Sequence, residues 1–209
     1  LIGFCGGPLT TFLFMFRGNE KNKSFDTAID FFKKEKKKSM KIMEMLTEAS
    51  IEYTKNQVES GIDCFQLFET YSGIISNEDY YKLILPLSTK ILLEARESGV
   101  PTIFFPKNFH EGLKYINKEM CDYVSVDYDI SLEYARNLLD SDVGIQGNMD
   151  PKTFYLEIDQ IDNYLESLID FGSKNTDWIF NLGHGFRPDI DHNKVKYVVD
   201  WIKNANWKR

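Results

Sequence analysis

The feature that most constrains the fold of this chain is a regular alternation of short apolar runs with longer segments of helical periodicity. The apolar runs are rich in Phe, Ile and Val and cover residues 1–5, 64–68, 102–105, 123–126, 143–147 and 178–182. Each is followed by a helical pattern, which is typical of a parallel sheet whose strands are joined by helices. Six such units predict an α/β fold, either a doubly wound open sheet or part of a (β/α)8 barrel.

The segments between the strands predict individual helices. We expect these over residues 10–16, 24–60 with one break, 76–97 with a kink at Pro86, 111–120, 131–139, 150–172 and 193–205, and a polar loop over residues 18–23. Residues 76–79 resemble a capping box, and Asp150 and Pro151 are expected to be the N-cap and the first residue of their helix. The strands of residues 1–5, 102–105 and 178–182 are expected to be buried. Helical spacing predicts an apolar face in the long helix, formed by Ile42, Leu46, Ala49 and Tyr53. The inner face of the last helix is expected to consist of Val195, Val198, Val199 and Ile202.

Charge and composition argue against several classes of protein. The net charge of −7 speaks against a general nucleic-acid binder. No uninterrupted apolar run approaches the ~20 residues of a membrane span. Cys5, Cys64 and Cys121 are far apart and form neither a CxxC nor an HxC pair, so neither a disulfide framework nor a zinc site is predicted. A reducing, cytoplasm-like compartment is the default expectation.

Polar side chains follow the predicted strands at the points where they end. They are Thr70, Lys107, Asp127, Asn148 and His184. In either kind of α/β fold, sites lie at the carboxyl ends of the strands. His184 stands between Gly183 and Gly185, where a ligand could approach it closely, but a turn histidine in contact only with water fits the same pattern.

Four segments carry a resemblance to the uroporphyrinogen decarboxylase family. Residues 181–185 with Pro188 and Asp189 resemble its C-terminal signature, and residues 3–8 resemble its GFAGAPWT segment. Residues 65–70 with Gly73 resemble its strand ending in F-D/E-S, and residues 147–151 resemble its GNLDP loop. The resemblance implies a (β/α)8 TIM barrel with about six of the eight βα units present, because it covers only the later part of the family's sequence. Residues 1–209 would then be the C-terminal part of a single barrel domain, in an N-terminally truncated chain.

The resemblance also implies a function. The family is a carboxy-lyase that removes carbon dioxide from the four acetate side chains of uroporphyrinogen III and produces coproporphyrinogen III for tetrapyrrole synthesis. It uses no cofactor and no metal, and it acts in the cytoplasm as a homodimer on this small-molecule substrate, with no nucleic acid and no membrane as partner. Its substrate-binding Asp and arginines lie in an upstream part with no counterpart here. The isolated 209-residue chain is therefore expected to be inactive.

Three positions of the family's site can be placed on this sequence as substrate-binding residues. His184 matches the site histidine, and Thr70 takes the place of a serine and keeps its hydroxyl. Phe14 stands where the family has a tyrosine, so a hydroxyl is lost, and Arg17 replaces an acid. Strand-end packing for Thr70 and core packing for Phe14 are the structural alternatives, and packing is the favoured reading for Phe14.

Two other functions remain open from the sequence. One is a zinc-dependent corrinoid methyltransferase of the same fold, which binds zinc through an HxC pair and a further cysteine. The chain has Pro106-Lys-Asn108 where the HxC pair would stand, and it has His184 where the further cysteine would be expected. The other is a non-catalytic tetrapyrrole-binding relative, which the loss of the tyrosine hydroxyl at Phe14 supports weakly.

Overall fold

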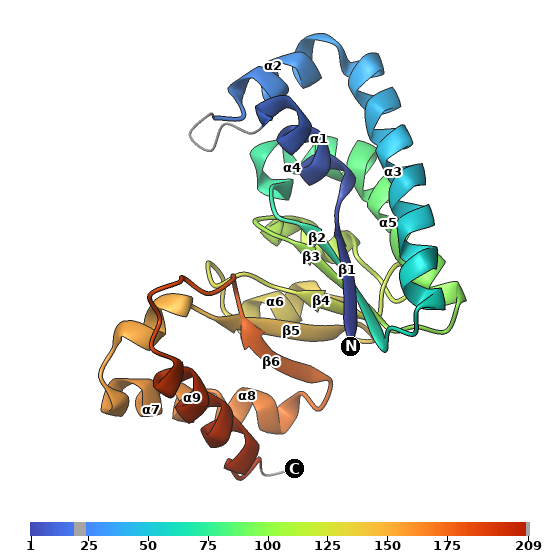
Figure 1. Ribbon diagram of the computed structural model, residues 1–209. Helices are drawn as coiled ribbons and strands as arrows, with labels where there is room; N and C mark the ends of the chain where they lie inside the picture. Colours follow the sequence, from blue (N-terminus) through green and yellow to red (C-terminus); the bar gives the residue numbers. More distant parts are fainter. Residues whose placement is uncertain (19–23, 208–209) are drawn as a thin grey trace. The chain divides into compact units, whose positions relative to one another are not determined.

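The structure is a computed structural model that describes residues 1–18 and 24–207. Apart from Gly18, the loop predicted over residues 18–23 lies outside the described residues. The strands are parallel where their pairing is defined and follow one another in sequence order (Figure 1). They are β1 (Ile2–Gly6), β2 (Cys64–Glu69), β3 (Thr102–Pro106), β4 (Tyr123–Ser125), β5 (Gly144–Met149) and β6 (Trp178–Leu182). The predicted α/β alternation is confirmed as six parallel strands with α-helices between them, except that a short 3₁₀ turn replaces the predicted helix between β3 and β4.

The helices occupy the predicted intervals, but several are divided or shortened. The α-helices are α1 (Pro8–Arg17), α2 (Asp26–Lys34), α3 (Lys36–Glu59), α4 (Asn77–Asp79), α5 (Leu85–Glu97), α6 (Leu132–Leu138), α7 (Ile158–Ser167), α8 (Ile169–Lys174) and α9 (His192–Asn204). Short 3₁₀ turns are η1 (Ser72–Ile74), η3 (His110–Tyr115) and η4 (Pro151–Tyr155), and η2 (Tyr80–Ile84) is a π-helical turn. The irregularity predicted at Pro86 is this π turn, which directly precedes the helix that carries the proline in its first turn.

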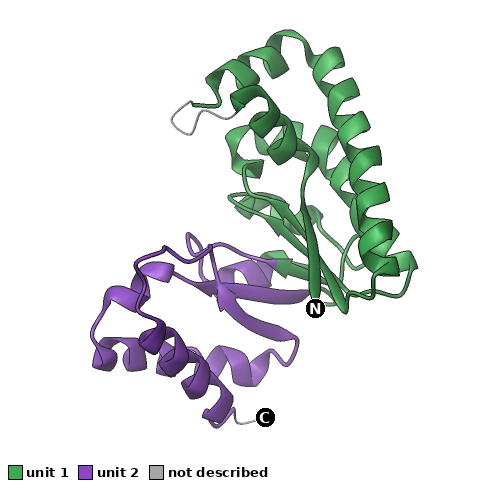
Figure 2. Cartoon of the chain, in the orientation of Figure 1, with its two compact units in different colours: residues 1–124, 138–143 green, residues 125–137, 144–209 purple. Residues whose placement is uncertain are grey.

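The chain divides into two compact units, which are described separately (Figure 2). Unit 1 comprises residues 1–124 and 138–143, and unit 2 comprises residues 125–137 and 144–209. Unit 1 contains β1, β2, β3 and the helices α1 to α5. Unit 2 contains β5, β6 and the helices α7 to α9, together with most of α6. In unit 1, α3 runs alongside α5 (Figure 1).

The sheet of unit 1 is covered by helices on one face. Phe65, Leu67 and Phe104 are fully buried, and β3 is buried along its whole length as predicted. The prediction of a buried strand is wrong for two of the five residues of β1, because Ile2 is 54% exposed and Phe4 is 61% exposed. It is also wrong for β6 in unit 2, in which no residue is fully buried. The two faces of β1 differ in burial. Side chains alternate between the two faces of a strand. Gly3 and Cys5 therefore face the covered side, while Ile2 and Phe4 face the open side.

The buried face of α3 differs from the predicted one. Ala49 is exposed, Tyr53 is 55% exposed, and Ile42 and Leu46 are only half-buried. The residues that face inward are Ser39, Met43, Thr47 and Thr54. The hydroxyls of Thr47 and Thr54 donate to the carbonyl oxygens of Met43 and Ser50, one turn back in the helix. The two threonines can be buried in the interface because their hydrogen bonds are satisfied within the helix.

In unit 2 the helical stretch predicted over residues 150–172 is three elements. Asp150 accepts a hydrogen bond from the backbone N–H of Lys152, so it caps η4 with Pro151 at the first position, as predicted. A new helix, α7, then starts at a capping box formed by Glu157 and Gln160. The predicted end at Gly172 is wrong, because α8 continues to Lys174.

The last helix, α9, presents a narrower apolar face than its spacing predicts. Val198 is buried, whereas Val199 is 42% exposed. Aromatic rings complete the packing here, since Trp207 contacts both Trp178 and Trp201 with ring centroids 5.8 Å and 6.3 Å away. Among the described residues, no helix has both the length and the apolar character that crossing a membrane requires.

Candidate functional site

Two of the sequence-predicted site residues lie close together in unit 1. Phe14 is in the second half of α1, and Thr70 directly follows β2 as a half-buried residue. The ring of Phe14 contacts the ring of Tyr71, the neighbour of Thr70, with 5.7 Å between the centroids. It also contacts Phe25 at 5.7 Å. The structure therefore brings the helix that carries Phe14 against the strand end that carries Thr70.

The surroundings of Phe14 are a mixed aromatic and cationic cluster and not the apolar core. Phe14 is 38% exposed. The guanidinium carbon of Arg17 lies 4.3 Å from the centroid of the Phe14 ring and 5.2 Å from that of Phe25. Arg17 has no ion-pair partner among the described residues, and its buried Nε has no hydrogen-bond partner among them. A guanidinium held by aromatic rings keeps its N–H donors for a carboxylate.

Sequence reasoning missed the most unusual polar group of this region, Glu69. It is fully buried at the end of β2. Its Oε1 accepts hydrogen bonds from the backbone N–H groups of Leu9, at 3.1 Å, and of Thr10, at 3.3 Å. Burial raises the pKa of Glu69 to about 8, although the two hydrogen bonds act in the opposite direction. A carboxyl side chain inside an apolar strand was the signal in the sequence, because such residues are almost never buried without a partner.

His184 lies in unit 2, in the exposed loop that follows β6. Its Nδ1 accepts a hydrogen bond from the backbone N–H of Gly185 at 2.8 Å. In the neutral ring this bond assigns the proton to Nε2, which then points a donor away from its own backbone. Gly183 is required at the start of the loop, because a Cβ there would collide with the backbone of Tyr128. The loop is thus anchored at Gly183 while the imidazole stays accessible to a ligand.

The other polar residues at strand ends hold backbone in place. In unit 2, the side-chain amide of Asn148 donates to the carbonyl oxygens of Asp127, at 2.9 Å, and Ile130, at 2.6 Å. Asp127 is buried, and its Oδ1 accepts from the backbone N–H of Asp129 at 3.0 Å. In unit 1, the backbone N–H of Lys107 donates to the carbonyl oxygen of Glu69. These contacts give Asp127 and Asn148 a role in shaping the loop after β4.

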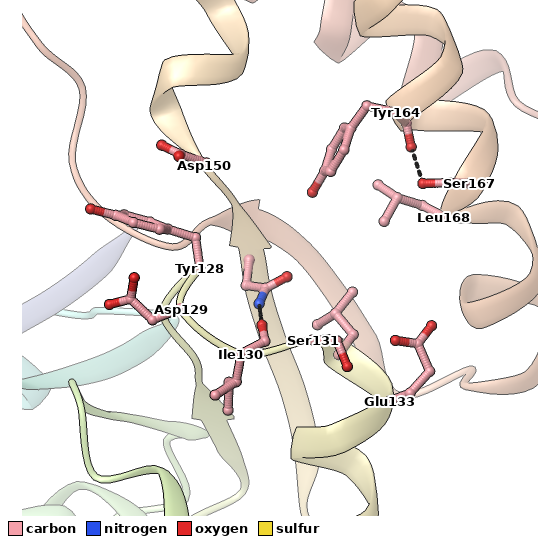
Figure 3. A pocket seen from close by; sticks show the side chains of 11 residues that line it. Tyr128, Asp129, Ile130, Ser131, Glu133, Asp150, Tyr164, Ser167 and Leu168 are labelled. Carbon is pink, nitrogen blue, oxygen red and sulfur yellow. Dashed lines mark hydrogen bonds between the residues drawn. The ribbon is translucent and has the colours of Figure 1, made fainter.

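A cavity of about 440 Å³ lies at this loop in unit 2 (Figure 3). It is lined by the segment 128–133, by Asn148 and Asp150 at the end of β5, and by Tyr164, Ser167 and Leu168 from the junction of α7 and α8. Burial, assisted by the charge of Asp150, raises the pKa of Tyr164 to about 12, so its hydroxyl is neutral. The described lining holds the carboxylates Asp129, Glu133 and Asp150 and no Lys or Arg. Like charges repel, so this cavity is unsuited to a carboxylated ligand.

Neither the cysteines nor the acidic residues form a recognisable metal centre in the described part of the chain. No three His, Cys, Asp or Glu side chains there are grouped closely enough to hold one ion. Cys5 and Cys121 are buried, and burial raises the pKa of each thiol to about 12. Both are therefore protonated thiols near neutral pH, whereas a thiolate is the form that binds metals.

Sequence similarity to known proteins covers nearly the whole chain. The family model described as uroporphyrinogen decarboxylase (URO-D) matches residues 1–205. Similar curated proteins include the uroporphyrinogen decarboxylase of Trichlorobacter lovleyi, 31% identical over 202 residues, and that of Aquifex aeolicus, 30% identical over 205 residues. These matches cover 97% and 98% of this chain but only 59% and 60% of the relatives, so the chain spans about three fifths of their length.

One solved structure has a fold similar to that of this chain. It is dihydropteroate synthase from Anaplasma phagocytophilum, with a TM-score of 0.57 and 13% sequence identity, over 97% of this chain and 74% of that one. At this identity the likeness concerns the α/β fold alone. The family model is the specific finding, since it matches nearly every residue of the chain, including all four segments in which the sequence resemblance was found. This chain therefore belongs to the uroporphyrinogen decarboxylase family.

Proposed function

We propose that the full-length protein is a decarboxylase that converts uroporphyrinogen III to coproporphyrinogen III by removing carbon dioxide from the four acetate side chains. The observation that carries the proposal is the family match over residues 1–205, together with relatives named uroporphyrinogen decarboxylase at about 30% identity. By the same reasoning we place the enzyme in the cytoplasm as a homodimer, and we infer that the six βα units belong to a (β/α)8 barrel.

The reaction needs an electron sink, a proton donor and a means of holding carboxylates. A proton first adds to a ring carbon of the pyrrole that carries the acetate. The bond between the methylene and the carboxylate then breaks, carbon dioxide leaves, and the electron pair flows into the cationic ring. Proton transfer to the methylene carbon and loss of the ring proton leave a methyl group and restore the pyrrole. No redox cofactor enters this balance, so the protein's part is positioning and electrostatic stabilisation.

The residues assigned to substrate binding suit that part. His184 offers an Nε2–H donor in an accessible loop, and Thr70 offers a hydroxyl at the end of β2. Phe14 presents a partly exposed ring with Arg17 stacked on it, so this segment combines an apolar surface with donors for a carboxylate. We infer that Arg17 partly compensates for the hydroxyl that a tyrosine would supply at Phe14.

The test is conversion of uroporphyrinogen III by the purified full-length protein, followed by chromatographic separation of the porphyrins after oxidation. We expect coproporphyrinogen to accumulate at the same rate with and without EDTA. An activity that EDTA abolishes and zinc restores, with a thiol as methyl acceptor, would instead support the methyltransferase. Binding of uroporphyrinogen without any turnover would support the non-catalytic relative.

A further inference from the structure

We propose that Glu69 is a positioning residue that fixes the helix carrying Phe14 and Arg17 to the strand end carrying Thr70. The inference rests on the proposed function, because it concerns the geometry of the substrate-binding residues assigned there. Glu69 itself is fully buried, so it acts through these neighbours.

The first observation is that Glu69 supplies the cap that α1 lacks. The N-terminal N–H groups of a helix have no partner within the helix and are usually satisfied by a polar N-cap side chain. The N-cap of α1 is Gly7, which has no side chain. The Oε1 of Glu69, sixty residues away in sequence, accepts from Leu9 and Thr10 in its place. Gly7 is the matching partner, because a Cβ at that position would collide with the Glu69 side chain.

The second observation is that the backbone of Glu69 joins two further elements. Its carbonyl oxygen accepts from the backbone N–H of Lys107, at the end of β3, and from the hydroxyl of Ser72, in η1, each at 3.1 Å. The carbonyl oxygen of the preceding residue, Phe68, accepts from the N–H of Gly7 at 2.9 Å. The ends of β2 and β3, the start of α1 and η1 therefore meet at this one residue.

The consequence for the site follows from the geometry of α1. Phe14 and Arg17 lie about two and three turns beyond the capped end of the helix, and Thr70 is bonded covalently to Glu69. We call the hydrogen bonds from Leu9 and Thr10 to the Glu69 side chain the clamp. Loss of the clamp would let α1 shift or fray at its N-terminus. The cluster of Phe14 and Arg17 would then move relative to the Thr70 hydroxyl. A displacement of about 1 Å can reduce turnover on the order of a hundredfold.

The protonation state of Glu69 indicates which substitution should preserve the clamp. Its Oε2 has no hydrogen-bond partner among the described residues, and Glu69 forms no ion pair with any of them. The titratable groups that interact electrostatically with Glu69 are the hydroxyl of Tyr80 and the thiol of Cys5, neither of which carries a positive charge. With a pKa raised to about 8 by burial, Glu69 is mainly a neutral acid at pH 7. A glutamine offers the same acceptor oxygen without a charge.

The experiment compares Glu69→Gln and Glu69→Ala in the full-length protein, with Glu48→Ala on the exposed side of α3 as the control for loss of a carboxylate. Amide hydrogen exchange at Leu9 and Thr10 reports on the clamp without substrate, and kcat and KM report on the site. We expect Glu69→Gln and Glu48→Ala to keep slow exchange and a kcat within about threefold of wild type. Glu69→Ala should speed exchange at both amides and lower kcat about tenfold to a hundredfold, with a smaller change in KM.

Three outcomes would overturn the proposal. One is unchanged exchange and kcat in Glu69→Ala, and another is a loss in Glu69→Gln as large as in Glu69→Ala. If Glu69→Ala does not fold, Glu69→Asp replaces it, since a side chain one methylene shorter cannot reach both amides. The third outcome is full activity with slow exchange in Glu69→Asp. An inactive wild type would contradict the proposed function, whereas the exchange measurements would still decide whether Glu69 holds α1.

Discussion

The buried carboxyl of Glu69 predicts a specific dependence of stability on pH. An unfolded chain restores this side chain to water, where its pKa is near the ordinary value of 4.5, whereas burial raises the pKa in the folded protein to about 8. Between these values the folded state holds a proton that the unfolded state has lost. The free energy of unfolding therefore decreases as the pH rises. The stabilising contribution is fully present below pH 4.5 and is lost as the pH passes the folded pKa of about 8.

The size of the effect follows from the two pKa values. At ~1.4 kcal/mol for each pH unit, the interval from 4.5 to about 8 corresponds to a loss of about 5 kcal/mol. Over the narrower range from about pH 5.5 to about pH 7.5, one proton per molecule gives about 3 kcal/mol. Glutamine does not titrate, so the free energy of unfolding of Glu69→Gln relative to wild type should rise by that amount across the range.

The assay is urea unfolding of the full-length wild type and Glu69→Gln at several pH values, with the difference between the two proteins taken at each pH. The difference removes the contribution of all other titrating groups, and Glu48→Gln shows the effect of removing an exposed carboxylate from the same unit. A constant difference between wild type and Glu69→Gln over this range would refute the reasoning. It would mean that Glu69 is ionised in the folded protein, with its charge satisfied by the N-terminus of α1.

Other residues lead to further predictions. His184→Ala should lower kcat/KM by the factor that corresponds to the ~1.5–3 kcal/mol of a hydrogen bond to a charged group, while the midpoint of unfolding stays unchanged. The control is His192→Ala, which removes an exposed histidine. Equal kinetics in the two variants would show that His184 is only a turn residue. Phe14→Tyr should raise kcat without loss of stability, because the ring is 38% exposed and the added hydroxyl can reach water; an unchanged or lower kcat in steady-state assays would show that the hydroxyl has no role in this protein. The 209-residue chain expressed by itself should be inactive and should self-associate through β1, where Ile2 and Phe4 are exposed. Phe4→Lys should reduce that association in light scattering, and a monomeric, cooperatively melting wild-type chain would contradict this prediction.

Much of the fold follows from the sequence by itself. The positions of all six strands could be predicted, because a run of Phe, Ile and Val between helical patterns is a local signal that does not depend on distant residues. The caps at Asp150 and Ser76 were equally local, since an acceptor side chain satisfies N–H groups two or three residues further on. The family resemblance and the positions of Thr70 and His184 at strand ends also came from the sequence.

Burial and charge state were decided by the tertiary structure. The face of α3 that points inward is set by the elements that pack against it, so hydrogen-bonded threonines could replace the more apolar face that spacing suggested. The exposure of Phe4 depends on whether another element covers that face of β1. Glu69 is the clearest case. In the sequence it is one acid at the end of a strand, and only the fold places the N-terminus of α1 over it and excludes water. Desolvation and a helix end sixty residues away then determine both its pKa and the groups it holds.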